Sequence, residues 1–339
     1  MRRIALTILA ILTVSICGFA QTYKVTGSIP IPGEGGWDYL YADADARLLY
    51  VSHSTQVDVI DLESGKPITS ITGMKRIHGI AVAPELNRGF ISDGGDDAVV
   101  IFDLKSRAVL QKVATGKNPD GIVYDANTKR LFAFNGRSGD VTAIDGATGQ
   151  VAGTIALGGK PEFPVTDNAG NIYDNIEDKS EIVRIDPKAL KVTATWSLAP
   201  CDEPSGLAYD SSNKRLFAVC DNKKMAVVDT TSGKVVTTVT IGEGPDATAF
   251  DSEKKLIFSS NGEDGTLTVV KQESADKYTV ADTAKTEKSG RTLALDQKTH
   301  KLYISAAQFG PAPAATADNP HPRPKIVPGT FHLVVVSPE

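Results

Sequence analysis

The sequence lacks the short motifs by which most enzyme classes are recognised. It contains no GxSxG nucleophile elbow, no HExxH zinc motif, no phosphate-binding loop and no CxxCH haem-attachment site. A motif-based assignment to these classes is therefore excluded. Any catalytic site has to be assembled from residues that lie far apart in the chain.

Apolar runs long enough to cross a membrane are also missing after residue 20. The N-terminus carries a shorter one, in which Arg2 and Arg3 precede 13 uncharged residues at positions 4–16 and a small-x-small site at Gly18–Ala20. This pattern predicts a cleaved signal peptide over residues 1–20, with cleavage near Ala20–Gln21. We expect the mature chain, residues 21–339, to be one propeller domain in the periplasm or medium, without a transmembrane span.

Cysteine is scarce, with three in the whole chain. Cys17 lies in the predicted leader, where a lipoprotein anchor is the alternative to simple cleavage. Ile16 disfavours that anchor, because a small side chain usually precedes a lipidated cysteine. The mature chain keeps Cys201 and Cys220, in a compartment where disulfides persist.

What the sequence does contain is a repeat of about 42 residues. Its marker is an apolar strand that ends in aspartate, and successive aspartates are 42, 42, 41 and 43 residues apart, at Asp61, Asp103, Asp145, Asp186 and Asp229. The third unit shows four short strands, at 121–124, 131–134, 141–145 and 150–157, without helical periodicity. Because these aspartates recur before turns, we interpret them as structural caps of backbone amides.

Four antiparallel strands cannot bury both faces of a sheet alone, so the units must stack on one another. Seven units stacked radially predict an all-β, seven-bladed β-propeller with four antiparallel strands per blade. The last strand, 331–336, lacks a fourth strand in its unit, and an orphan strand at 23–29 precedes the first unit. We therefore expect the N-terminal strand to complete blade seven and close the ring.

Particular repeat strands carry a family resemblance. Leu49–Ser52 with Val57–Asp61 is the clearest example, and Pro119–Gly121 and Pro245–Ala247 are typical blade openings. Together they resemble the YVTN or YncE-like family of bacterial propellers over essentially the whole mature chain. The resemblance implies the fold and an exported protein. It implies no agreed reaction, and some members are thought to bind DNA or other partners.

Polar side chains recur on one face of the predicted ring, which we call the mouth face. The loops that enter strand one and leave strand two lie there, because these strands form a hairpin. Entering strand one are Asp38, His78, Asp120, Glu162, Glu203, Asp246 and Arg291; leaving strand two are His53, Asp93, Asn135, Asn175, Asp221 and Asn261. We expect them to surround the channel and bind a cation, a polar ligand or a basic partner. Plain turn chemistry of Asp and Asn is the alternative.

Two histidines stand out because histidine has no comparable turn preference. His53 and His78 belong to adjacent blades, so with Asp93 and Asp38 they are candidates for a divalent metal site, or one imidazole for a general base. Hydrogen-bonded structural histidines are the alternative, since no short ligand motif is present. No other cofactor is expected.

The same hairpin geometry applies to blade five. Cys201 precedes its strand one and Cys220 ends its strand two, which predicts a disulfide that stabilises the fold by about 3 kcal/mol.

Blade seven carries a proline-rich insert at 307–330, with His321 and Arg323. It must emerge on the mouth face, where we expect a basic lid; a disordered loop is the alternative.

Three functions are consistent with these features. The first is a monomeric binding module for a protein, a peptide or a small polar ligand. The second is a metal-assisted hydrolase, lactonase or lyase, by analogy with other propellers. The third, DNA binding, is implied by the resemblance alone, and a formal net charge of −5 opposes it. We favour the binding module, because catalytic motifs are absent.

Overall fold

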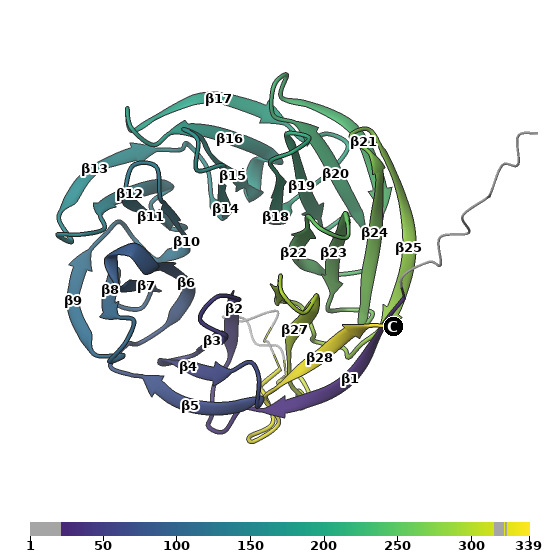
Figure 1. The fold of residues 1–339 in the computed structure, drawn as a ribbon, viewed down its shortest axis with the longest axis horizontal. Coiled ribbons are helices and arrows are strands. Elements are labelled where there is room, and N and C mark those ends of the chain that lie inside the picture. The colour runs from purple at the N-terminus through teal and green to yellow at the C-terminus, as the bar shows by residue number, and fades with distance from the viewer. Residues whose placement is uncertain (1–21, 315–321, 323) are drawn as a thin grey trace, which may run out of the picture.

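The computed structural model describes residues 22–314, 322 and 324–339, which form seven four-stranded sheets around a central axis (Figure 1). The seven-bladed propeller expected from the repeat is confirmed. The predicted signal peptide, its cleavage near Ala20–Gln21 and Cys17 lie outside the described residues. Within those residues, no helix combines the length and the apolar character needed to cross a bilayer.

Each blade is built from four antiparallel strands that follow one another outwards from the axis. Strand one is β2 (Trp37–Asp43), β6 (Ile77–Ala83), β10 (Pro119–Asp125), β14 (Pro161–Thr166), β18 (Pro204–Asp210), β22 (Pro245–Asp251) or β26 (Leu293–Asp296). Strand two is β3 (Leu48–His53), β7 (Arg88–Asp93), β11 (Arg130–Asn135), β15 (Ile172–Ile176), β19 (Arg215–Cys220), β23 (Leu256–Asn261) or β27 (Lys301–Ala306).

The outer half of each blade follows the same order. Strand three is β4 (Gln56–Asp61), β8 (Ala98–Asp103), β12 (Asp140–Asp145), β16 (Glu181–Asp186), β20 (Lys224–Asp229), β24 (Thr266–Ser274) or β28 (His332–Pro338). Strand four is β5 (Lys66–Ile71), β9 (Val109–Ala114), β13 (Val151–Ala156), β17 (Lys191–Ser197), β21 (Lys234–Thr240), β25 (Lys277–Lys285) or β1 (Tyr23–Pro30). Two 3-10 turns, η1 (Pro84–Leu86) and η2 (Glu177–Lys179), interrupt the pattern.

The ring is closed by the two ends of the described chain. Strand β1 pairs antiparallel with β28, from Tyr23 opposite Pro338 to Pro30 opposite His332. In Figure 1 the purple N-terminal strand lies along the yellow C-terminal one. The expectation that the N-terminal strand completes blade seven is confirmed, and this pairing covers what would otherwise be an open edge of the last sheet.

The hydrophobic core is divided among the interfaces between neighbouring blades. One apolar cluster, for example, joins Tyr50 of blade one to Ile91 and Phe102 of blade two. Strands two and three are buried on both faces and are largely apolar, whereas the outer β17 alternates between exposed and half-buried residues. Packing between blades therefore fixes strand one at the axis, where it lines the channel.

Local chemistry stabilises the turns as expected. Asp61 accepts a hydrogen bond from the amide of Ser64 at 2.6 Å, and Asp145 accepts one from Thr148 at 2.7 Å. The amide and then the hydroxyl of Thr148 hold the pKa of Asp145 below its usual value. The structural interpretation of these aspartates is confirmed. The Cys201–Cys220 disulfide is also confirmed, with the two Cα atoms 5.7 Å apart.

Candidate functional site

The mouth of the channel is surrounded by side chains at one repeated position. In six blades this is the second residue of strand one, and in blade seven it lies two residues before the start of the short β26. Serines at the ends of the second strands hold the backbone there: Ser92 donates to the Asp120 carbonyl at 2.6 Å, and Ser52 accepts from the Asp38 amide at 2.8 Å. The charged residues at this position, which we call the mouth ring, are Asp38, His78, Asp120, Glu162, Asp246 and Arg291.

Three of the predicted mouth residues lie beside this position. Glu203 precedes β18 with a φ of 48°, and Ser205 occupies the ring position of blade five. Asn175 lies inside β15, where its amide donates to the Ser205 carbonyl at 2.7 Å. Asp221 follows β19. Glu203 lies two positions before the ring position because the turn that enters β18 (198–203) is longer than the one that enters β14 (157–160), whereas Asn175 and Asp221 lie one position before and one position after the paired ends of their second strands.

The side chains at the ends of the second strands form their polar contacts within their own blades. His53 Nδ1 lies 2.8 Å from an Asp58 oxygen, and Asp93 accepts from Lys112 at 2.9 Å. The amides of two asparagines donate to strand-three threonines: Asn135 to Thr142 at 3.0 Å and Asn261 to Thr268 at 2.9 Å. Strand three supplies the partners of His53, Asn135 and Asn261, and strand four supplies Lys112, so all four side chains have a structural role within their blade.

The structure brings together Asp38, His78 and Asp120, from three adjacent blades. Their potential ligand atoms all lie within 4.8 Å of one another. His78 Nδ1 is 2.5 Å from Asp38 Oδ2 and 3.6 Å from Asp120 Oδ1. The predicted metal set of His53, His78 and Asp93 is not brought together: His53 bonds to Asp58 of strand three, Asp93 bonds to Lys112 of strand four, and two aspartates lie beside His78 instead.

Charge and burial shift several pKa values around the ring. Burial lowers the pKa of His78, but its hydrogen bond to Asp38 and the nearby carboxylates raise it overall. Burial, and then the charge of Asp38, raises the pKa of Asp120 to about 6. Burial, and then the charge of Asp120, raises the pKa of Glu162 to about 8. At neutral pH Glu162 therefore retains a proton that an exposed glutamate would have lost.

One further buried carboxyl was not predicted. Asp174 of β15 is fully buried, and within the described residues neither of its oxygens has a hydrogen-bond partner. Burial, followed by the charge of Glu162, raises its pKa well above the usual value. Strand pairing aligns it with Ala133 and Ala218 of neighbouring blades, so a polar residue in an apolar strand was the available signal.

An aromatic pair divides the channel. Tyr39 of blade one donates its hydroxyl to the Glu162 carbonyl of blade four at 2.8 Å, and its ring lies 5.0 Å from that of Phe163. At the same position the other blades have small residues: Gly79, Gly121, Gly206, Ala247 and Thr292. Sequence reasoning missed this divider, although two aromatic residues in a column of small ones were a usable signal.

A cavity of about 760 Å³ opens on the mouth side of the divider. Six carboxylates and two cations are among the described residues that line it: Glu162, Glu177, Glu203, Asp221, Asp246 and Glu263, with Lys160 and Arg291. Lys160 pairs with Glu162 and Glu177, and Arg291 pairs with Asp246 at 3.0 Å. The apolar wall comes from Trp37, Phe309 and Pro324.

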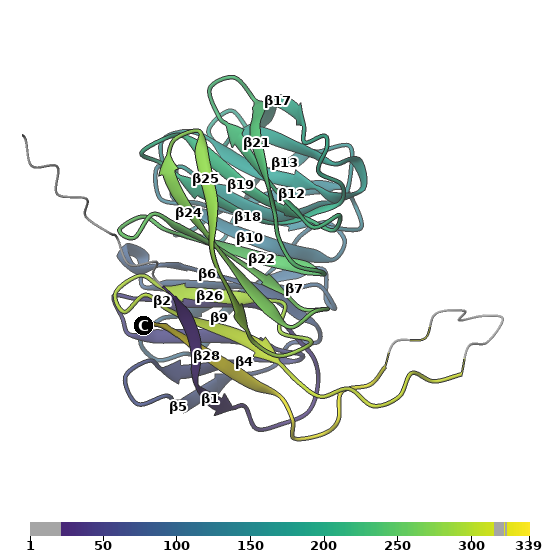
Figure 2. The ribbon, with the colours of Figure 1, turned by 90° about the vertical axis from the view of Figure 1, so that its right-hand side faces the viewer.

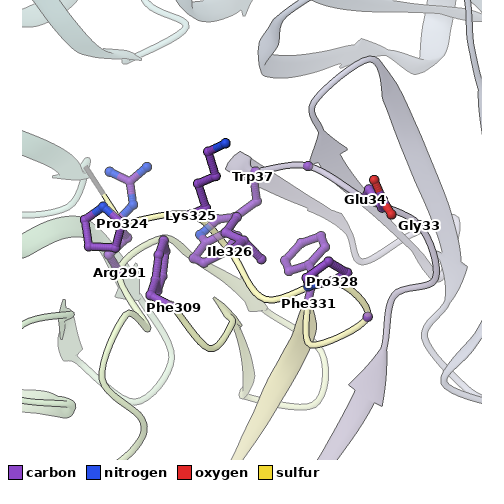
Figure 3. A pocket seen from close by; sticks show the side chains of 13 residues that line it. Gly33, Glu34, Trp37, Arg291, Phe309, Pro324, Lys325, Ile326, Pro328 and Phe331 are labelled. Atoms are coloured by element: carbon purple, nitrogen blue, oxygen red, sulfur yellow. The ribbon is translucent and has the colours of Figure 1, made fainter. Parts of the chain in front are cut away.

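The base of the proline-rich insert supplies that wall. Trp37 stacks on Phe331 with centroids 5.1 Å apart, and Phe309 lies 6.0 Å from the same indole. Despite its prolines the base is paired, with a bridge between Phe309 and Ile326. Figure 3 shows a second cavity here, of about 460 Å³, with Lys325 and Arg291 extending to one side. In Figure 2 the coloured arms of the insert project away from the ring, and His321 and Arg323 of the expected lid lie outside the described residues.

Comparison with known proteins agrees with this architecture. No protein-family model matches the chain. The protein named "Uncharacterized protein YncE" is 29% identical over 140 residues in Salmonella typhi and over 141 residues in Escherichia coli K12. The match covers 38% of this chain and 39% of each relative, so it spans well under half of their length. The chain is a YncE-like propeller.

Solved structures support the fold of this YncE-like propeller across nearly its whole length. A chain of a mitotic checkpoint complex superposes with a TM-score of 0.75, covering 99% of this chain and 98% of that one at 14% identity. A chain of Kuenenia stuttgartiensis hydrazine synthase superposes with a TM-score of 0.69, covering 81% and 94% at 14% identity. At such identities the likeness concerns the fold alone.

Proposed function

We propose that this YncE-like propeller is an exported binding module whose mouth cavity binds a cationic segment of a partner, such as a lysine- or arginine-rich peptide. The observation that carries the proposal is the lining of the cavity, with six carboxylates against two cations. Carboxylates that line a concave site concentrate the field of their charges and attract cations. DNA, a polyanion, is disfavoured by the same surface.

The ion pairs inside the cavity sharpen this argument. Lys160 and Arg291 pair with Glu162, Glu177 and Asp246, and no ion pair involving Glu203, Asp221 or Glu263 is found among the described residues. These three acids are free to bind cationic groups of a ligand. Beside them, Phe309, which is exposed and packs against the buried Trp37, offers an aromatic surface on which guanidinium groups and aliphatic stems pack well.

Anisotropy of a labelled peptide tests this function. A fluorescein-labelled decapeptide of alternating lysine and proline should bind, and a peptide with glutamate in place of lysine should not. The double variant Glu203→Gln/Glu263→Gln should weaken binding about 5- to 30-fold, since each lost charge pair contributes on the order of 0.5–1 kcal/mol. Glu63→Gln, in a turn on the opposite face, is the matched control and should bind like the wild type. Equal binding of both peptides would contradict the proposal.

Export is part of the proposal and is supported by two features. The leader-like pattern at residues 1–20 and the Cys201–Cys220 disulfide both fit an oxidising compartment. Mass spectrometry of the protein recovered from periplasm or medium should give a chain that starts near Gln21. Recovery of an intact Met1 in the cytosol with reduced thiols would oppose it.

A metal-assisted reaction is the second candidate, favoured by one observation. Asp38, His78 and Asp120 offer one nitrogen and carboxylate oxygens within 4.8 Å of one another, a donor set that suits a divalent ion. Metal analysis of protein purified without chelator tests it. Stoichiometric zinc, manganese or calcium that is lost in the His78→Ala variant would favour an enzyme; a metal-free wild type unaffected by added ions would oppose it.

A further inference from the structure

The half of the channel beyond the divider has a lining of a different kind. It contains a cavity of about 390 Å³, formed by the strand-one residues of blades one to five. Its walls include Tyr41, Val82, Val123, Val165 and Tyr209, and no charged residue is among the described ones that line it. Since strand one of each blade starts at the mouth, these later residues lie towards the opposite face. We call this space the far cavity.

Two aromatic residues lie at the inner end of the far cavity. Tyr39 and Phe163 belong to its lining, and they contact each other across the axis between this cavity and the acidic mouth. A ligand that enters from the opposite face therefore meets these two rings at the inner end. The volume of the far cavity lies in the range of small-molecule sites, roughly 300–1,000 Å³.

The polar atoms of this lining are few and mostly engaged. The Tyr124 hydroxyl donates to Glu85 at 2.6 Å, and the Thr166 hydroxyl donates to Asp125 at 2.9 Å. Burial, and then the charge of Asp43, raises the pKa of Tyr41 to about 12, so its phenol stays a hydrogen-bond donor at physiological pH. Water in such a pocket finds few partners, and an apolar ligand that displaces it gains free energy.

We propose that the far cavity binds a neutral, largely apolar small molecule with an aromatic ring. Val123 and Val165 are half-buried and face this space with apolar surface, while Tyr39, Phe163 and Tyr209 present aromatic rings to it. Ring-on-ring packing favours an aromatic ligand over an aliphatic chain of equal area. A charged ligand is disfavoured, because the lining offers no opposite charge to replace its hydration.

N-phenyl-1-naphthylamine, a neutral aromatic probe whose fluorescence rises in apolar surroundings, tests this site on the full mature chain. We expect saturable binding of one probe per protein. Val123→Phe and Val165→Phe fill the cavity from two different blades, and each should weaken probe binding at least tenfold. Val236→Phe, on the exposed face of β21, is the matched control and should leave binding unchanged.

Two outcomes would overturn the proposal: no saturable binding to the wild type, or unchanged binding to both filling variants once circular dichroism shows them folded. Competition in the wild type adds a test that needs no variant. The lysine–proline peptide should not displace the probe, whereas displacement would put the probe in the mouth cavity and also overturn the proposal. Because peptide binding is measured separately, failure of the far cavity and failure of the mouth cavity are distinguishable.

Discussion

The two halves of the channel are built from the same seven strands, yet their chemistry is opposite. The mouth half has carboxylates, one histidine and two cations, and several of its carboxyls are buried enough to have raised pKa values. The far half has valine, isoleucine and tyrosine side chains and no charge among its described lining residues. Moving three or four residues along strand one therefore changes the lining of the channel from an acidic one to an apolar one.

This difference shows how a repeat fold holds two sites without a second domain. Interblade packing fixes every strand one in the same way, so each position along the strand forms a ring around the axis. Substitutions within one ring change the lining of the channel at one level along the axis and leave the lining at the other levels unchanged. The divider made by Tyr39 and Phe163 keeps the two depths apart.

The largest expected effect follows from removing the divider. Tyr39→Ala should lower the free energy of unfolding by about 2–3 kcal/mol, because it removes a half-buried aromatic ring and leaves a cavity. Tyr39→Phe keeps the ring and loses the hydrogen bond to the Glu162 carbonyl, so it should cost about 1 kcal/mol. Urea unfolding followed by circular dichroism measures both values. Equal losses in the two variants would show that the ring does not pack across the channel.

The next largest effect is a difference in pH dependence between ligand binding at the mouth cavity and ligand binding at the far cavity. Deprotonation of Glu162, whose pKa is raised to about 8, adds one negative charge to the wall of the mouth cavity, so the affinity for the lysine–proline peptide should rise about tenfold between pH 6 and pH 9. Protons should be released on binding. The affinity of the far cavity for the neutral probe should stay constant over the same range. Peptide binding that weakens with rising pH would contradict a role for Glu162.

The protonation of Glu162 should also make the free energy of unfolding depend on pH, with a smaller effect than on peptide binding. The pKa of Glu162 is about 8 in the fold against 4.5 for an unperturbed glutamate, so the folded chain holds a proton that the unfolded chain releases between these values. The contribution of the Glu162 carboxyl to the free energy of unfolding is therefore fully present below about pH 4.5 and is lost as the pH rises through 8. At pH 9, Glu162→Gln should be more stable than the wild type by about 1 kcal/mol in urea unfolding, and at pH 4.5 the two should agree. A wild type that gains stability towards pH 9 would contradict this.

Much of the fold was predictable because it depends on spacing. The regular aspartates of the third strands predict the number of blades, and the orphan strand near Tyr23 predicts how the ring closes. The mouth ring followed from the hairpin of strands one and two wherever the turns keep the common length. In blade five the turn differs, so Glu203 was placed where Ser205 stands.

The rest of the site depends on side-chain direction, which spacing does not show. His53 and His78 look equivalent in sequence, but His53 bonds to Asp58 of strand three, whereas His78 bonds to Asp38 of the preceding blade. The contact of Tyr39 with Phe163 joins residues more than a hundred positions apart, and only an alignment of the repeats, which places these two aromatic residues in a column of small ones, indicates it.

The smallest expected effect concerns salt. Raising sodium chloride from 50 to 300 mM shortens the screening length to below about 8 Å, so peptide binding at the exposed acids Glu203 and Glu263 should weaken about threefold. Probe binding in the far cavity should stay the same, because apolar burial does not depend on screened charge. Parallel titrations at both salt concentrations measure the two changes. If both ligands respond alike to salt, they share one site, and the division of the channel into an acidic half and an apolar half has no functional consequence.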